Sequence, residues 1–191
     1  MPRVFIAAPV AAEAKCILID MINELDRIYG KSLRTVKPST LHITMKFLGD
    51  VPGDKIRLMA PILDKHLLGI TSFALGFATI GIFPQVGYPR TIWVGMKGDI
   101  EKLKSVKYVV DKAVFETLGF PCEKPGFVPH ITLARANGYF HKDLLIDLRK
   151  QLSGYIEPPS FHWCVNQVEL VKSILTASGP IHETLHRTLL K

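Results

Sequence analysis

Two short segments of this sequence, HITM beginning at His42 and HITL beginning at His130, carry side chains that can do chemistry together. In a β-strand the residues at i and i+2 share a face. Each segment would therefore place an imidazole beside a hydroxyl, Thr44 in the first and Thr132 in the second, with apolar residues on the opposite face. A single His-x-Thr is usually an ordinary strand, but two equivalent copies indicate one shared site.

Two imidazoles and two hydroxyls suit attack at phosphorus. Because the pKa of histidine is about 6.5, one imidazole can be neutral and accept a proton from water while the other is protonated and gives a proton to the leaving oxygen. The threonine hydroxyls can donate hydrogen bonds to the phosphoryl oxygens, where negative charge accumulates. This chemistry requires no metal ion.

Other kinds of site fit the sequence less well. A metal site would use the same two histidines, but no Asp or Glu lies near either at ligand spacing, and threonine is a poor ligand. A serine hydrolase would need a GxSxG motif, and Ser178 has no glycine two residues before it. The remaining histidines are interpreted as ordinary surface or core residues: His66, His141, His162, His182 and His186.

The separation of the two motifs, 130 − 42 = 88 residues, recurs along the chain and predicts an internal repeat. A shift of 88 places the β-rich run beginning at Val4 on the run beginning at Ile92. Each half then has the predicted order β-α-β-α-β. The further elements expected from apolar periodicity are helices over 13–28, 52–68, 101–116 and 142–152 and strands over 73–83 and 161–175.

This repeat predicts an α+β fold with two lobes related by a pseudo-two-fold axis. Antiparallel sheets would face a central cleft, with the helices outside them. Residues 1–191 would form a single bilobal domain, with halves of about 1–83 and 91–175. The crossover between the halves is expected at 81–90, which is rich in glycine and proline.

Composition narrows the class of protein. Of the 191 residues 48% are hydrophobic and 21% charged, which excludes a disordered chain and supports a sizeable core. No apolar run approaches the roughly 20 residues of a membrane span, and the N-terminal apolar block is too short for a signal peptide. The three scattered cysteines, without a CxxC pair, favour a reduced cytoplasmic setting.

The net charge of +7 leaves two interpretations of the surface open. A basic balance suits an anionic partner such as RNA, DNA or a nucleotide. It equally fits a solvated surface that is rich in lysine, because the charges do not gather into an arm or tail.

The paired motifs, in a chain of this length, resemble the two-histidine (2H) phosphoesterase superfamily, and within it the RNA 2′,3′-cyclic phosphodiesterases, also called 2′-5′ RNA ligases. The similarity runs nearly end to end. A departure follows Gly179, where the family often has an aromatic residue and this chain has His182. The segments that carry the resemblance are 3–7, 41–49, 83–84, 89–93, 129–135 and 170–175.

The resemblance implies a bilobal fold with the site in its cleft, no metal or cofactor, and hydrolysis of a 2′,3′-cyclic phosphate to a 2′-phosphomonoester. Carried over by residue, His42 would be the proton donor and His130 the proton acceptor, with Thr44 and Thr132 holding the phosphate. Arg135, after the second motif, would contact the phosphate or nucleotide.

Four further residues are candidates for contacts with substrate. Lys46 is added from strand parity, which places it on the face of His42; a solvent-facing lysine is the alternative. Phe47 and Phe83 could stack on a base or pack in the core. Arg90 lies in the crossover that matches the family and is taken as a further substrate-binding residue.

The expected partners are RNA or nucleotides that end in a 2′,3′-cyclic phosphate, including tRNA fragments, and the protein is expected to be a monomer without a membrane partner. The reverse reaction, joining RNA ends through a 2′-5′ linkage, is equally allowed by one reversible site. The alternative of another class is a non-catalytic RNA- or nucleotide-binding module, which would not need four matched residues.

Overall fold

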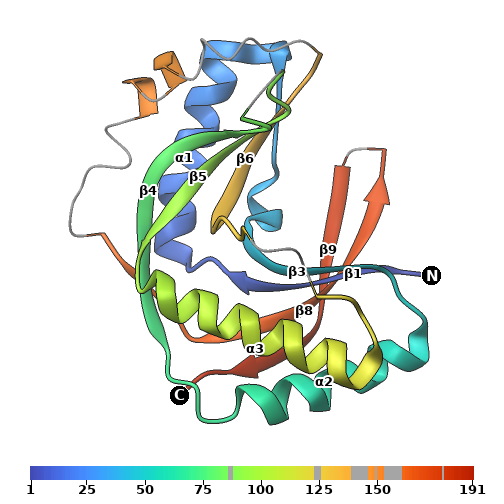
Figure 1. Cartoon of the computed structure of the whole chain (residues 1–191). Coiled ribbons are helices and arrows are strands. Elements are labelled where there is room, and N and C mark those ends of the chain that lie inside the picture. The colour runs from blue at the N-terminus through green and yellow to red at the C-terminus, as the bar shows by residue number, and fades with distance from the viewer. Residues whose placement is uncertain (86–87, 123–125, 139–145, 149, 153–160, 178) are drawn as a thin grey trace.

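The computed structural model describes residues 1–85, 88–122, 126–138, 146–148, 150–152, 161–177 and 179–191 (Figure 1). In this part of the chain the helices are α1 (Ala12–Tyr29), α2 (Gly53–Leu67) and α3 (Ile100–Leu118), with short 3-10 turns η1 (Gly30–Ser32) and η2 (Pro38–Thr40). The strands are β1 (Arg3–Pro9), β2 (Leu33–Thr35), β3 (His42–Asp50), β4 (Phe73–Phe83), β5 (Thr91–Gly98), β6 (His130–Ala136), β7 (Trp163–Val165), β8 (Gln167–Thr176) and β9 (Gly179–Leu189).

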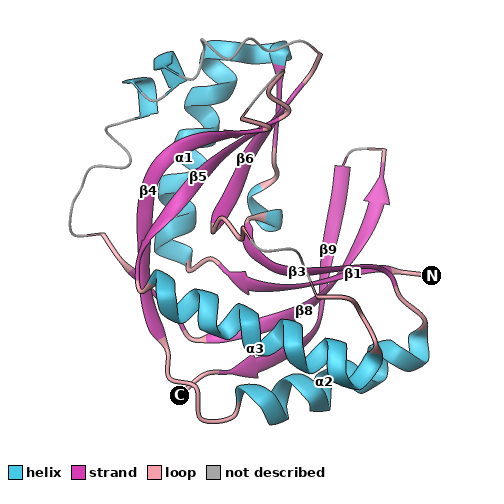
Figure 2. Ribbon diagram, in the orientation of Figure 1, coloured by secondary structure: helices cyan, strands magenta, loops and turns pink. Residues whose placement is uncertain are grey.

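The internal repeat is visible in where the elements begin. β1, α1 and β3 begin at residues 3, 12 and 42, and β5, α3 and β6 begin at residues 91, 100 and 130. Each pair is 88 residues apart, which is the spacing of the two His-x-Thr motifs. The expected α+β class, with two antiparallel sheets, is confirmed (Figure 2).

The strands form two sheets that draw on both halves of the sequence. Sheet A has the order β3-β1-β8-β9, and sheet B has the order β2-β6-β5-β4-β7. The last long strand of the first half, β4, therefore pairs with β5 of the second half, and β8 pairs with β1 of the first. The two halves exchange their third strands rather than folding side by side.

The helices are exchanged in the same way. α1 of the first half contacts β2 and β6 in sheet B, whereas α3 of the second half contacts β3 in sheet A. α2 packs on α3 and β9, so both lie along sheet A (Figure 1). Each helix has an apolar stripe that this packing requires, and in α1 the buried residues recur at helical spacing: Ala14, Leu18, Met21, Ile22 and Leu25.

Three sequence expectations need correction or fall partly outside the described residues. The predicted strand over 161–175 is broken at Asn166, and its pieces lie in different sheets, β7 in sheet B and β8 in sheet A. Strands β2 and β9 were not predicted, because β2 has three residues and the sequence of β9 is polar. Of the helix expected over 142–152, residues 146–148 and 150–152 are helical and the rest lies outside the described residues.

None of the helices in the described part of the chain combines the length and apolar character needed to cross a membrane.

Candidate active site

The two motif histidines are held by the same backbone device. His42 Nδ1 lies 2.6 Å from the carbonyl oxygen of Thr40, and His130 Nδ1 lies 2.8 Å from that of Val128. A carbonyl oxygen only accepts, so Nδ1 carries the hydrogen and donates it in both residues. Nε2 of each neutral ring is then left with its lone pair, in the form that a proton-transferring imidazole needs.

A hydroxyl lies beside the free nitrogen of the first histidine. The Nε2 atom of His42 is 2.9 Å from Oγ1 of Thr44. When the ring is neutral the hydroxyl donates to Nε2, and when the ring is protonated Nε2 donates to the hydroxyl oxygen. Thr44 and Thr132 are both half-buried, at the same place in β3 and β6, and these two strands contact each other.

A β-bulge in each motif strand reverses the alternation of faces. Ile6 pairs with Lys46 and Ala7 pairs with Thr44, so that Met45 is an extra residue. In the second copy Leu133, 88 residues later, is the extra residue opposite β5. Side chains after each bulge therefore face the opposite way from simple alternation.

The bulge brings Arg135 to the face of His130 and Thr132. Arg135 is exposed, and its positive charge adds to the effect of burial in lowering the pKa of His130. The Nη1 atom of Arg135 lies 3.3 Å from Oγ1 of Thr91. Arg90 precedes Thr91, is exposed, and its carbonyl accepts a hydrogen bond from the backbone N–H of Ala136.

The bulge at Met45 in β3 makes the strand-parity prediction for Lys46 wrong. Lys46 faces the protein interior, where only 1% of it is exposed. Its ammonium forms an ion pair with Asp111 of α3 and donates to the carbonyl of Pro121 at 2.8 Å. Lys46 therefore joins the back of β3 to α3 and does not reach the face of His42.

Aromatic rings border both histidines. The Phe5 ring lies 4.7 Å from the His42 ring, and the Trp93 ring lies 5.8 Å from the His130 ring. Phe5 and Trp93 are themselves 88 residues apart, so they occupy equivalent places in the repeat. Trp93 also lies against Gly81, where a Cβ atom would collide with the indole ring.

The two candidate stacking phenylalanines have different surroundings. Phe83 is half-buried, and its ring meets the His130 ring edge-on at 5.1 Å. Phe47 occupies the position equivalent to Arg135 and is 66% exposed, so core packing does not account for it. Its ring lies 6.1 Å from Phe5.

A third imidazole, which the sequence analysis treated as ordinary, lies in the site. His182 of β9 meets His42 edge-on with ring centroids 5.2 Å apart, and it lies 5.0 Å from Phe5. Its signal in the sequence was the departure from the family pattern, an imidazole in place of an aromatic residue. The strand β9 that carries it was not predicted.

The ligand-free site favours neutral imidazoles. Burial lowers the pKa of His42 to about 4 against the hydrogen bond to Thr40, and the charges of His182 and His130 lower it further. Burial also lowers the pKa of His130, with a smaller contribution from Arg135, and burial lowers the pKa of His182. A bound anion would reverse this trend, because negative charge favours the imidazolium form.

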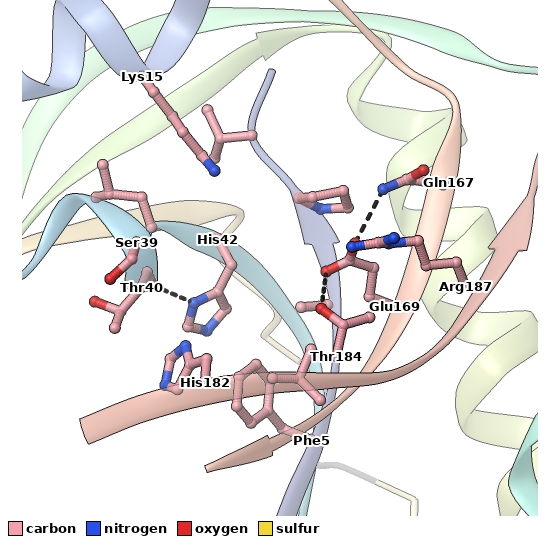
Figure 3. Close-up of a pocket in the computed structure, with 15 residues that line it drawn as sticks. Phe5, Lys15, Ser39, Thr40, His42, Gln167, Glu169, His182, Thr184 and Arg187 are labelled. Carbon is pink, nitrogen blue, oxygen red and sulfur yellow. Dashed lines mark hydrogen bonds and ion pairs between the residues drawn. The ribbon is translucent and has the colours of Figure 1, made fainter. Parts of the chain in front are cut away.

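A pocket of about 320 Å³ opens beside His42 (Figure 3). Its walls come from β1, β8 and β9 of sheet A, from η2 and from the first turn of α1. His130 and Thr132 do not line it, so it extends the site on the His42 side only. Lys15 of α1, which the sequence analysis did not single out, also lines it.

In the described residues, no group of three or more His, Cys, Asp or Glu side chains is arranged to hold a metal ion.

The sequence matches a family profile and curated proteins of one kind. The sequence profile of the LigT-like phosphoesterase family matches residues 9–93 and 100–182, one segment in each half. An RNA 2′,3′-cyclic phosphodiesterase of Aeropyrum pernix is 33% identical over 159 residues, covering 82% of this chain and 86% of that protein. The enzyme of the same name from Archaeoglobus fulgidus is 29% identical over 187 residues, covering 96% and 97%.

Solved structures share the fold. TT0787 of Thermus thermophilus superposes with a TM-score of 0.78 at 23% identity, covering 98% of this chain and 97% of that one. E. coli LigT complexed with 3′-AMP superposes with a TM-score of 0.74 at 23% identity, covering 100% and 98%.

Proposed function

Since this chain belongs to the LigT-like phosphoesterase family, we propose that it hydrolyses the 2′,3′-cyclic phosphate at the end of an RNA or nucleotide to a 2′-phosphomonoester. The names of the relatives support the substrate class. The observation that carries the proposal is the matched pair of imidazoles, each with Nδ1 donating to the carbonyl two residues earlier. A binding module would gain nothing from two such imidazoles.

The reaction needs one proton donor and one proton acceptor. His130, neutral, takes a proton from a water molecule as the water oxygen bonds to phosphorus. The bond from phosphorus to the 3′-oxygen breaks, and protonated His42 gives its proton to that oxygen. The 2′-oxygen keeps the phosphate, and the two imidazoles return to their starting states by proton exchange with solvent.

The remaining side chains stabilise charge on the phosphate. Thr44 and Thr132 donate hydrogen bonds to the non-bridging oxygens as negative charge accumulates there. Arg135, on the face of His130, supplies a positive charge and planar N–H donors that suit a phosphate. Arg90 directly precedes Thr91, the residue of β5 that pairs with Arg135, and adds a second positive charge. Phe47 and Phe83 are the rings available to a base.

The same ring opening can use an alcohol as the nucleophile, with the 3′-oxygen again leaving and taking its proton from His42. With a 5′-hydroxyl in place of water, His130 would deprotonate the hydroxyl and the two RNA ends would join through a 2′-5′ linkage. We propose that the protein works in the cytoplasm as a monomer. Its substrates would be RNA ends, such as those of tRNA fragments. Three free, exposed cysteines suit a reducing compartment: Cys16, Cys122 and Cys164.

Turnover of 2′,3′-cyclic AMP in the presence of EDTA tests the proposal. We expect hydrolysis that survives the chelator, with 2′-AMP as the product seen by phosphorus NMR. The double variant His42→Gln/His130→Gln is the control for a contaminating phosphodiesterase and should be inactive. Activity that needs a divalent ion would contradict the mechanism. A 3′-phosphate product would exchange the roles of His42 and His130 as proton donor and acceptor. Binding without turnover would favour the non-catalytic module.

A further inference from the structure

A lysine reaches into the pocket beside His42. Lys15 lies in the first turn of α1 and is half-buried, and its ammonium points into the pocket from the side opposite His182 (Figure 3). No hydrogen bond or ion pair joins its side chain to another residue in the described part of the chain. The ammonium thus lines the pocket without a counter-charge from the described residues of the protein. An anionic ligand would supply the missing partner.

The other charged groups of the pocket are already paired. Arg187 donates from Nε to a Glu169 oxygen at 2.9 Å, and Gln167 donates to the same oxygen at 3.0 Å. Thr184 donates to the second oxygen of Glu169 at 3.3 Å. The carboxylate and guanidinium thus neutralise each other, and Lys15 supplies the uncompensated positive charge of this wall.

The start of α1 adds to the positive potential. Its N-cap residue, Ala11, has no side chain that could cap the first-turn N–H groups, and the adjoining Val10 lines the pocket. The positive end of a helix dipole favours an anion at this position. The helix start and the Lys15 ammonium therefore attract the same kind of ligand.

The substrate dictates which anion this is. The cyclic phosphate belongs to the 3′ end of an RNA, so the strand continues only through the 5′-oxygen of its terminal nucleotide. The next negative charge along the chain is therefore the phosphodiester on that 5′-oxygen. A nucleotide whose cyclic phosphate contacts His42 would extend into the adjoining pocket.

We propose that this pocket is a subsite for RNA, in which Lys15 binds the phosphodiester on the 5′ side of the nucleotide that carries the cyclic phosphate. This inference rests on the proposed function. It makes the protein an enzyme for the ends of RNA chains rather than for free cyclic nucleotides. A mononucleoside cyclic phosphate has no phosphate at this place and would leave Lys15 without a ligand.

Two substrates that differ in this phosphodiester test the subsite. These are adenosine 2′,3′-cyclic phosphate and the dinucleotide ApA ending in a 2′,3′-cyclic phosphate. The wild type should have the higher kcat/KM for the dinucleotide. Lys15→Met should lower kcat/KM for the dinucleotide about tenfold or more, as expected for a lost contact to a charged group. The same variant should leave kcat/KM for the mononucleoside within about twofold.

Two further variants serve as controls at constant salt. Lys15→Arg retains the charge and should restore most of the preference for the dinucleotide. Lys65→Met removes one positive charge from an exposed position on α2 and should leave kcat/KM unchanged for both substrates. An equal effect of Lys15→Met on both substrates, or no effect on either, would overturn the subsite while hydrolysis by the wild type still supports the proposed function. A wild type that hydrolyses neither substrate would instead contradict the function itself.

Discussion

At the scale of single residues, the two motif histidines are held by the same type of backbone hydrogen bond but differ in environment. Both donate from Nδ1 to a backbone carbonyl, yet among the described residues a second imidazole, His182, lies against the ring of His42 and none lies against that of His130. The pKa of His42 is lowered to about 4, so the proposed proton donor is neutral in the ligand-free site at pH 7. The negative charge of a bound phosphate must raise this pKa before His42 can act as an acid.

Replacement of either histidine tests its role. His42→Gln and His130→Gln should each lower kcat by about 10²–10⁴, the usual contribution of a positioned acid or base. The double variant should lose less than the two single losses combined, since both groups act in one transfer. Circular dichroism should show an unchanged fold. A single variant with nearly full activity would remove that histidine from the mechanism.

The pH dependence follows from the direction of the pKa shifts. In the free enzyme both imidazoles have a pKa below 6.5, and the value for His42 is about 4. kcat/KM should therefore rise with pH through the lower value, fall through the higher one, and reach its maximum between about pH 4 and 6.5. The maximum of kcat should lie at higher pH, because bound phosphate raises both values. Coincident maxima near pH 7 would contradict this account.

At the scale of elements, the extra residue that directly follows the His-x-Thr of each motif strand determines which side chains face the substrate. The bulges at Met45 and Leu133 occupy equivalent places and reverse the alternation after Thr44 and Thr132. As a result Arg135 is exposed on the face of the site. Lys46 in the first copy corresponds to Ala134, the residue before Arg135 in the second copy. The side chain of Lys46 is directed into the interior and forms an ion pair with Asp111.

Lys46 should therefore matter for stability rather than for catalysis. Lys46→Met removes an ion-pair partner of the buried Asp111, while the Lys107 ammonium stays 3.7 Å away. The free energy of unfolding should fall by about 3 kcal/mol, the lower end for a broken buried ion pair. kcat/KM, measured where the variant is folded, should stay within about threefold.

An exposed lysine provides the comparison. Lys104 pairs with Glu101 on the surface of α3, so Lys104→Met should change the free energy of unfolding by less than about 1 kcal/mol. Denaturant titration of both variants gives the two values. A large loss of kcat/KM in Lys46→Met without loss of stability would return Lys46 to the substrate-binding residues.

At the scale of the whole molecule, the two sequence halves are interleaved. Sheet A needs β8 from the second half, and sheet B needs β4 from the first. In the described residues nearly all the buried apolar side chains form one large cluster that extends through both sheets and the helices, and a small second cluster holds Phe5, Ala7 and Val171. We infer that neither half can form its sheet without the other, so that residues 1–191 fold as one domain.

Thermal unfolding and two fragments test this inference. The intact chain should unfold in a single transition with equal calorimetric and van't Hoff enthalpies. Fragments 1–90 and 91–191, each lacking a central strand of its sheet, should be unfolded when expressed alone. Mixing them should restore circular dichroism of the native type. A folded, independent half would show that the lobes follow the sequence halves.

The sequence by itself determined the parts that depend on local pattern. The spacing of 88 residues and the apolar periodicity located the two motif strands and the long helices, because a repeated unit keeps its turns and its buried face. The four residues of the paired motifs followed from the same repeat. Family resemblance pointed to Arg135, although strand parity alone would have placed it on the wrong face.

Only the tertiary structure decided what depends on pairing between distant segments. The bulges arise where β3 meets β1 and β6 meets β5, so the sequence of one strand could not show that Lys46 turns inward. The exchange of β4 and β8 between the sheets could not be predicted from the sequence, because it depends on which distant strands pair by hydrogen bonds. His182 and Lys15 lie 140 and 27 residues from His42 in the chain, and the packing of β9 and α1 around β3 alone places them beside it.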